Sequence, residues 1–325
     1  MSHYQVAVSL KTYGDVSVEQ ETLGREGSVR GVHIEGVDPA ELARVLADAD
    51  ALIVTNDTIS AASIDALPGS VQLIVRGGSG LDAIDLFAAQ RCGIAVANTP
   101  GYATDEVAGH ALAMILSCAR SLGPADLVAR STWNWREVPM PLRLADTRLG
   151  IVGGGRIGSR VAEMARNLLG EVAVFDPWAQ PKLANVTRVD TLGELLASSD
   201  IVSLHVALSE NTYHLLDEDA LRTLPRGARV VNSSRGGLVD EAALDRLVRT
   251  GHIACAALDV LELEPPGPAS PTTLNGSIAL SPHIAWASPS SGARARAMAT
   301  TTALEFLSGA PLTCGALATE AGTAV

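Results

Sequence analysis

Short apolar runs alternate with segments of helical spacing along most of the chain, and this alternation constrains the fold most strongly. Each run is rich in Val, Ile and Leu, and a polar turn follows it before the helical pattern begins. The expected strands are 6–10, 51–55, 71–76, 94–98, 148–152, 171–175, 200–205, 228–232 and 254–258, and the expected helices are 39–47, 83–91, 104–122, 156–167, 192–197, 241–250 and 292–307. Such alternation is typical of parallel sheets whose crossover helices cover both faces, so we expect the α/β class.

Two glycine-rich turns follow expected strands, which indicates two doubly wound units instead of one long sheet. Gly77-Gly78-Ser79-Gly80 follows the third strand and Gly153-Gly154-Gly155 the fifth. The length of 325 residues also suggests about two domains. The Asn98-Thr99-Pro100-Gly101 turn is a natural boundary, because proline disfavours helix at the residue before it.

Several classes of protein are excluded by composition. The net charge is −12 and no block of Lys or Arg stands out, so nucleic acid is not an expected partner. The apolar stretch 108–119 is too short for a membrane span, and the opening residues do not resemble a signal peptide. The four cysteines are widely spaced without a CxxC pair, so we expect neither a metal nor disulfides, and a cytoplasmic location.

A strand that ends in G-x-G-x-x-G and opens a helix predicts a dinucleotide site. Gly153 allows the tight turn, Gly155 lets a pyrophosphate approach the backbone, and Gly158 lets helix and strand pack closely. The next strand ends in Asp176, where a carboxylate can accept hydrogen bonds from the adenosine ribose. An acid at that place repels a 2′-phosphate, so we expect NAD in preference to NADP.

Polar residues follow three later strands, where ligands bind in open α/β sheets. These segments contain Arg235, Glu264 and His283. Each residue alone is typical of a turn or surface position, but their recurrence behind a cofactor loop favours catalysis. A serine hydrolase is excluded because the G-x-S-x-G elbow around Ser79 has Leu81 in place of its last glycine.

These motifs together resemble the D-isomer-specific 2-hydroxyacid dehydrogenase family. The motifs that carry the resemblance are 76–82 (RGGSGLD), 98–101 (NTPG), the glycine loop, 203–206 (SLHV), 232–236 (NSSRG), 258–265 (LDVLELEP) and 282–283 (PH). Residues 104–108 and Trp286 are similar to the branch that includes the C-terminal-binding proteins and phosphoglycerate dehydrogenase-like enzymes. The resemblance implies two Rossmann-like domains with the active site in the cleft between them. The first is discontinuous, a flavodoxin-like substrate domain of residues 1–98 and 288–325, and residues 99–287 form the NAD-binding domain with a dimerisation helix and arm over 104–145.

The resemblance also implies hydride transfer between NAD(H) and C2 of a small 2-keto or D-2-hydroxy acid. His283 would then act as acid and base, Glu264 would orient its ring, and Arg235 would bind the substrate carboxylate. Glu262 is the competing carboxylate, and Glu264 is preferred because the family pattern places its acid directly before proline. The implied substrate contacts are Gly78 and Ser79 through their amides, Tyr102, Arg235 and Trp286, and the implied cofactor contacts are Gly153, Gly155, Arg156, Ile157, Gly158, Asp176, His205, Thr212, Ser233 and Asp259.

Two further expectations concern partners and an alternative function. Residues 111–119 are too apolar all round for a helix that faces solvent, and the arm over 133–141 suits exchange across a two-fold axis, which predicts a homodimer. The alternative is a regulatory, corepressor-like protein that senses NAD(H) on the same fold, because fold does not fix function. Ala103 and Gly109 depart from residues common in the family and leave the choice of keto acid open.

Overall fold

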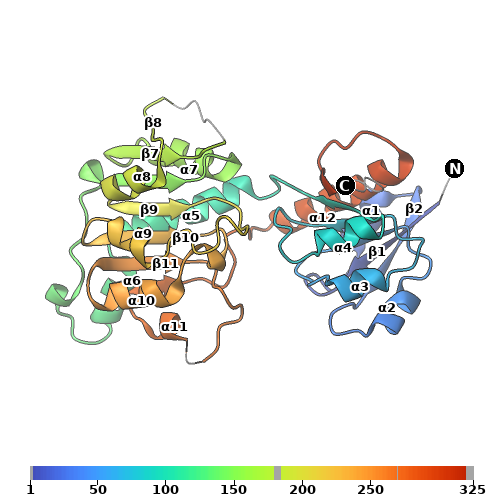
Figure 1. The fold of residues 1–325 in the computed structure, drawn as a ribbon, viewed down its shortest axis with the longest axis horizontal. Helices are drawn as coiled ribbons and strands as arrows, with labels where there is room; N and C mark the ends of the chain where they lie inside the picture. Colours follow the sequence, from blue (N-terminus) through green and yellow to red (C-terminus); the bar gives the residue numbers. More distant parts are fainter. Residues whose placement is uncertain (1–2, 179–183, 269, 320–325) are drawn as a thin grey trace. The chain divides into compact units, whose positions relative to one another are not determined.

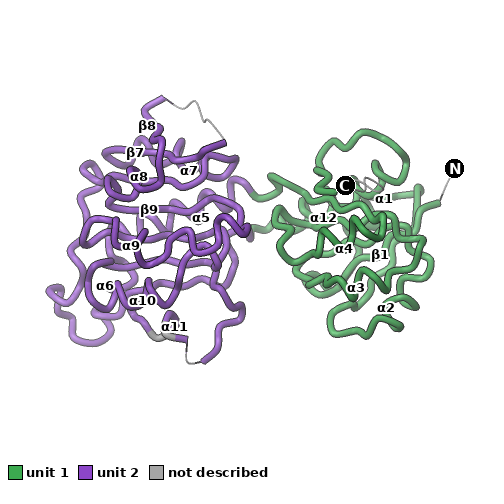
Figure 2. Tube along the Cα trace, in the orientation of Figure 1, with its two compact units in different colours: residues 1–103, 288–325 green, residues 104–287 purple. Residues whose placement is uncertain are grey.

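The computed structural model describes residues 3–178, 184–268 and 270–319, and these divide into two compact units (Figure 2). Unit 1 comprises Met1–Ala103 and Ser288–Val325, and unit 2 comprises Thr104–Ala287. The chain thus leaves unit 1, builds unit 2 as an insertion, and returns to unit 1 for its last helix. Each unit is an α/β fold built on one sheet (Figure 1).

Unit 1 is a six-stranded sheet in the order β13-β5-β4-β3-β1-β2. Its strands are β1 (Tyr4–Ser9), β2 (Gly27–Val32), β3 (Ala51–Val54), β4 (Leu73–Arg76), β5 (Ala95–Asn98) and β13 (Ala316–Thr319), and its helices are α1 (Ser17–Leu23), α2 (Pro39–Val45), α3 (Ala61–Asp65), α4 (Leu86–Arg91) and α12 (Ser291–Ser308). The first five strands are parallel in the order 2-1-3-4-5, which is the flavodoxin order. One buried cluster packs α2, α3 and α4 on one face, and a second packs α1 and α12 on the other.

Unit 2 is a seven-stranded sheet in the order β12-β11-β10-β9-β6-β7-β8. Its strands are β6 (Arg148–Val152), β7 (Glu171–Phe175), β8 (Thr187–Arg188), β9 (Ile201–Leu204), β10 (Ala228–Asn232), β11 (Ile253–Leu258) and β12 (Ile278–Leu280). Its helices are α5 (Thr104–Ala119), α6 (Leu122–Ala129), α7 (Arg156–Ala165), α8 (Leu192–Ser198), α9 (Glu218–Thr223), α10 (Glu241–Arg249) and α11 (Pro271–Leu274), with short 3₁₀ turns at Trp135–Glu137, Leu144–Asp146 and Gly236–Leu238. All pairings are parallel, and α5 and α7 cover one face while α8, α9 and α10 cover the other. This is the doubly wound order of dinucleotide-binding domains with one strand added.

Two sequence expectations differ from the structure. The single helix expected over 104–122 is broken, because Ser121 takes a left-handed backbone (φ 52°), and α5 and α6 are bent by 58°. No strand was expected after the helix over 292–307, but β13 lies there, pairs antiparallel with β5 and adds one antiparallel edge to an otherwise parallel sheet. No single helix among the described residues is long and apolar enough to cross a membrane, and α5 with α6 meets that test only as a bent pair.

Candidate functional site

The sheet of unit 2 brings four chemistry-bearing loops to one edge. Because its strands are parallel, the loops that leave β6, β9, β10 and β11 all start at the C-terminal edge of the sheet. The strand order reverses direction between β6 and β9, which are neighbours in the sheet. Ligands of open α/β sheets bind outside the C-terminal ends at such a switch point.

The glycine loop after β6 has the geometry of a phosphate cradle. A Cβ on Gly158 would lie 1.8 Å from the carbonyl oxygen of Gly153, so only glycine allows the helix to pack this closely on the loop. A Cβ on Gly155 would meet no atom of the described residues within 4 Å, so the backbone there is open to a ligand. No side chain of the described part of the chain caps the N-terminus of α7, which begins with Arg156 and Ile157. Its first amides are therefore suited to an anion.

Asp176 ties the end of β7 to this loop. Its Oδ2 accepts a hydrogen bond from the amide of Gly154 at 2.7 Å, and its Oδ1 accepts one from the amide of Trp178 at 2.8 Å. Only 9% of the residue is exposed. The structure therefore places a negative charge directly beside the glycine loop, as the sequence predicts.

Two buried polar atoms at the same edge have no hydrogen-bond partner within the described part of the chain. They are Nδ1 of His205, after β9, and Oγ of Ser233, after β10. The other ring nitrogen of His205 contacts the Ser203 hydroxyl at 2.9 Å, and burial lowers the pKa of His205 to about 4, so this ring is neutral at pH 7. Buried polar atoms are normally paired, so these two indicate that a ligand completes the edge. Together with the open cradle at Gly155, they fit a dinucleotide.

Thr212, the remaining predicted cofactor residue on the β9 side, closes the turn after that strand. Its hydroxyl donates to the carbonyl of Ala207 at 2.8 Å and accepts from the amide of Ser209 at 2.7 Å. The residue thus fixes the shape of this loop, and its contact with cofactor stays a prediction.

The structure brings His283 and Glu264 together as the sequence analysis proposes. Nδ1 of His283 lies 2.7 Å from Oε2 of Glu264, and Oε1 of Glu264 accepts from the amide of Leu261 at 2.9 Å. Burial raises the pKa of Glu264, but the hydrogen bonds from His283 and the Leu261 amide, with the charge of Arg235, outweigh it and hold that pKa below its usual value. An ionised Glu264 can only accept a hydrogen bond, so Nδ1 of His283 carries the proton between the two groups and Nε2 is the other ring nitrogen.

The competing carboxylate, Glu262, has other partners. Its Oε1 lies 3.0 Å from Nε2 of His214, and its amide donates to Oε1 of Glu241 at 2.5 Å. Because each acid of the β11 loop is engaged by a different partner, the geometry favours Glu264 as the acid that orients His283.

The loop that carries Arg235 is held by its own short contacts. Nδ2 of the buried Asn232 donates to the carbonyl of Arg235 at 2.7 Å, and its Oδ1 accepts from the amide of Ser234 at 3.0 Å. A Cβ on Gly236 would lie 1.9 Å from the carbonyl carbon of Leu261. Glycine at 236 therefore allows the Arg235 loop to pack directly against the loop that carries Glu264.

Asp259 organises the turn that carries His283. Its side chain, 1% exposed as a residue, accepts hydrogen bonds from the Ser281 hydroxyl at 2.5 Å and from the amides of Ile284 and Ala285 at 3.0 and 2.8 Å. Its carbonyl accepts from the amide of His283 at 2.8 Å, and the backbone of His283 is left-handed with φ 52°. Few non-glycine residues adopt this conformation, so surrounding contacts must hold it. The predicted role of Asp259 toward the cofactor stays a prediction, and its contacts in the structure are with this turn.

Comparisons with known proteins agree with this geometry. Residues 112–285 match the model of the D-isomer specific 2-hydroxyacid dehydrogenase NAD-binding domain. The chain is 37% identical to a glyoxylate reductase of Korarchaeum cryptofilum over 81% of each protein. It is 36% identical to a D-3-phosphoglycerate dehydrogenase of Archaeoglobus fulgidus over 78% of this chain. The structure of D-lactate dehydrogenase from Aquifex aeolicus, complexed with NAD and lactic acid, superimposes with a TM-score of 0.81 at 26% identity, covering 94% of this chain and 96% of that one.

The chain belongs to the D-isomer-specific 2-hydroxyacid dehydrogenase family. The predicted resemblance, the two-domain α/β fold and the NAD cofactor are thereby confirmed. The expectation of an NAD-dependent enzyme is confirmed at the level of the family, because the relatives described above carry the names of dehydrogenases and reductases. Those names do not favour the regulatory alternative. The chain spans about half the length of the phosphoglycerate dehydrogenase that it matches.

Three substrate residues that the family resemblance implies lie in unit 1, and one of them differs from expectation. The amide of Gly78 was expected to be open to a carboxylate, but it donates to the carbonyl of Arg76 at 2.8 Å within the glycine turn. Ser79 accepts from Nδ2 of Asn98 through its carbonyl at 2.7 Å, and the carbonyl of Tyr102 accepts from Arg294 at 2.5 Å. The predicted contacts of these residues with substrate stay predictions.

Trp286, the fourth predicted substrate residue, belongs to unit 2 and contacts the turn that carries His283. Its indole Nε1 donates to the carbonyl of His283 at 3.0 Å. Two other residues of this family member belong to the same polar cluster but were not predicted as site residues, His110 on α5 and Ser281 after β12. A histidine within an apolar helix and a serine before a proline carry no local signal of a site.

Proposed function

We propose that this family member is an NAD-dependent oxidoreductase that interconverts a small 2-keto acid and the D-2-hydroxy acid. The observation that carries the proposal is the His283–Glu264 pair at 2.7 Å, with Arg235 close enough to lower the pKa of Glu264, on the edge that also carries the glycine loop. A proton donor, its orienting acid and a fixed cation are what reduction of a keto acid requires.

Each residue has a distinct chemical task in this proposal. When bound, NAD(H) supplies or accepts the hydride at C2 of the substrate. His283 donates a proton from Nε2 to the C2 oxygen during reduction and removes it during oxidation. Glu264 fixes the ring and stabilises the imidazolium. Arg235 binds the substrate carboxylate with its planar fork of donors.

A substrate panel tests this function. We expect consumption of NADH, followed by its absorbance at 340 nm, with at least one acid among glyoxylate, hydroxypyruvate, pyruvate and benzoylformate. For hydroxypyruvate, pyruvate and benzoylformate, whose reduced products are chiral at C2, chiral chromatography should identify the D-hydroxy acid as the product. Binding of NADH without turnover of any member would contradict the proposal and favour the regulatory alternative.

Asp176 predicts a preference for NADH over NADPH. Its buried carboxylate lies beside the glycine loop. A 2′-phosphate there would bring a second negative charge close to the carboxylate, where little water screens their repulsion. We expect the Asp176→Ser variant to narrow the ratio of kcat/KM for NADH over NADPH by about 100-fold, since about 2.7 kcal/mol of repulsion is removed.

The control for this change is Glu171→Gln. Glu171 is an exposed acid at the opposite end of the same strand, β7. The Glu171→Gln variant should leave the ratio of kcat/KM for NADH over NADPH unchanged. A wild-type protein that uses NADH and NADPH equally well would refute the assignment of cofactor preference to Asp176.

We also propose that the protein is a homodimer through α6 and the arm over residues 133–141 of unit 2. Large apolar side chains are exposed there, most of all Trp133 at 82% and Met140 at 68%, and apolar patches of this kind are typical of interaction surfaces. Light scattering at micromolar concentration should give twice the chain mass for the wild type and the single-chain mass for a Trp133→Ser, Trp135→Ser double variant.

Trp178→Ser, which replaces an exposed tryptophan outside this patch, should leave the dimer intact. A wild-type chain that is monomeric at this concentration would contradict the proposal. Location in the cytoplasm stays a prediction.

A further inference from the structure

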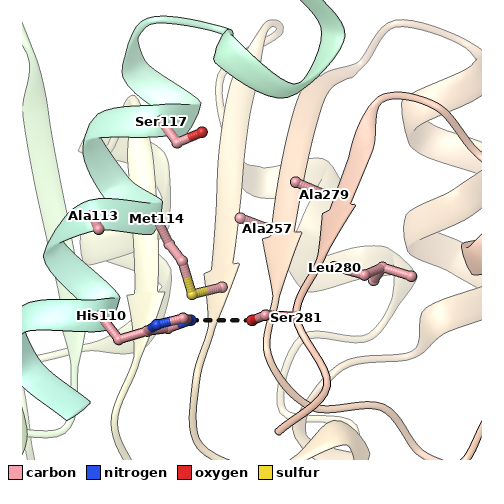
Figure 3. Close-up of a pocket in the computed structure, with 8 residues that line it drawn as sticks. All are labelled: His110, Ala113, Met114, Ser117, Ala257, Ala279, Leu280 and Ser281. Carbon is pink, nitrogen blue, oxygen red and sulfur yellow. Dashed lines mark hydrogen bonds between the residues drawn. The ribbon is translucent and has the colours of Figure 1, made fainter. Parts of the chain in front are cut away.

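A chain of polar side chains links helix α5 to the turn that carries His283. Nε2 of His110 lies 3.0 Å from Oγ of Ser281 and 3.5 Å from Oδ1 of Asp259. Figure 3 shows His110 and Ser281 pointing toward each other at one end of a pocket between α5 and the strands β11 and β12. The pocket is otherwise mostly apolar, with Met114, Ala257 and Ala279 among its walls. The polar contact is therefore a specific feature of one end of the pocket.

The direction of the hydrogen bonds follows from the number of protons available. Asp259 accepts from two backbone amides as well as from Ser281, which is the pattern of an ionised carboxylate. The single proton of the Ser281 hydroxyl therefore points to Asp259. The Ser281 oxygen can then only accept a hydrogen bond from His110, so Nε2 of His110 is protonated and is the donor.

The end of this chain is the catalytic turn. The same carboxylate that accepts from Ser281 also accepts from the amides of Ile284 and Ala285, the two residues after His283. A left-handed backbone is energetically unfavourable for a residue other than glycine, so the conformation of His283 depends on these contacts. Rotation of the Asp259 carboxylate would move both anchors together.

We propose that His110 is a positioning residue for His283, which it orients through Ser281 and the Asp259 carboxylate. This inference rests on the proposed function, in which His283 is the acid and base. Among the described residues, the polar contacts of His110 are with Ser281 and Asp259, and with none of the three groups assigned to catalysis, His283, Glu264 and Arg235. It holds Ser281 in the one rotamer that donates to Asp259, and Asp259 in turn holds the His283 turn.

Variants that separate hydrogen bonding from packing test the proposal. His110→Gln retains a donor near the place of Nε2, whereas His110→Leu keeps a similar volume without a donor, and Ser281→Ala removes the middle link. Ser117→Ala is the matched control, because Ser117 lines the same pocket on α5 but, within the described part of the chain, forms no hydrogen bond with His110, Ser281 or Asp259.

The first measurement does not depend on turnover. Hydrogen exchange of the full-length protein with NAD present should be about tenfold faster at the amides of Ile284 and Ala285 in His110→Leu and Ser281→Ala, the change expected for one lost hydrogen bond. His110→Gln and Ser117→Ala should match the wild type.

The second measurement is kinetic. We expect kcat for keto-acid reduction to fall about tenfold in His110→Leu with KM for NADH unchanged, and to recover to within about threefold of wild type in His110→Gln. Unchanged exchange in His110→Leu would overturn the proposal, and so would equal changes in the Leu and Gln variants, which would indicate packing alone. Changed exchange in a protein that turns over no keto acid would instead refute the proposed function and leave the positioning contact supported.

Discussion

Replacement of His283 by asparagine is expected to reduce kcat for keto-acid reduction by about 1,000-fold, within the range that general acid–base groups contribute. Glu264 holds Nδ1 of the ring at 2.7 Å, so Nε2 is the nitrogen that can donate to a substrate oxygen. Asparagine is close to isosteric with the inner part of the ring, but its amide is far too weak an acid to transfer a proton to the substrate. Binding of NADH, measured by its fluorescence, should remain within about threefold of wild type because the glycine loop is untouched.

Substitutions of Glu264 and Glu262, the two acids of the loop after β11, test the assignment of His283 as the proton donor oriented by Glu264. Glu264→Gln keeps a partner for Nδ1 but removes the charge that stabilises the imidazolium, so reduction should slow by about 10- to 100-fold. Glu262→Gln is the matched control, since Glu262 contacts His214 instead, and it should be nearly wild type. An active His283→Asn enzyme, or a larger effect of Glu262 than of Glu264, would contradict the assignment.

The fold was largely predictable from sequence because most of its strands are buried on both faces. Strands such as β3 and β11, with the sequences ALIV and IACAAL, are continuous apolar runs, and their ends differ little from the expected ranges. The strand β2 was not expected, because its sequence GSVRGV mixes glycine with a charge at the edge of the sheet. The break at Ser121 lies just before Gly123 and Pro124. Proline has no N–H to donate to the Arg120 carbonyl, so a continuous helix would lose a hydrogen bond there, and a local signal accompanies the bend.

The candidate site was also predictable only in part. Arg235, Glu264 and His283 lie in the loops that follow β10, β11 and β12, so the general rule for parallel sheets could bring them to one edge. Nothing local shows that the Gly78 amide is used inside its own turn, or that His110 on α5 reaches Ser281 across the sheet edge. Such contacts depend on side-chain directions between elements far apart in sequence, which periodicity does not specify.

Arg235 provides the second large effect. Arg235→Lys should lower kcat/KM for the keto acid by about 100-fold, because an ammonium cannot form the paired hydrogen bonds of a guanidinium with a carboxylate. Arg235→Gln, which also removes the charge, should lose about tenfold more. The backbone at Arg235 is held by Asn232 and by the close approach of Gly236 to Leu261, so these variants should alter the side chain and leave the loop in place.

The comparison that isolates this role uses a substrate without a carboxylate. The wild type should prefer a 2-keto acid over the matching 2-keto amide by about the factor that Arg235→Gln loses, and the variant should show little preference between them. Arg222→Lys, an exposed arginine paired with Glu218 on α9, is the control and should keep the wild-type ratio. If Arg235→Gln still discriminates the acid from the amide as the wild type does, another cation binds the carboxylate and Arg235 acts elsewhere in the reaction.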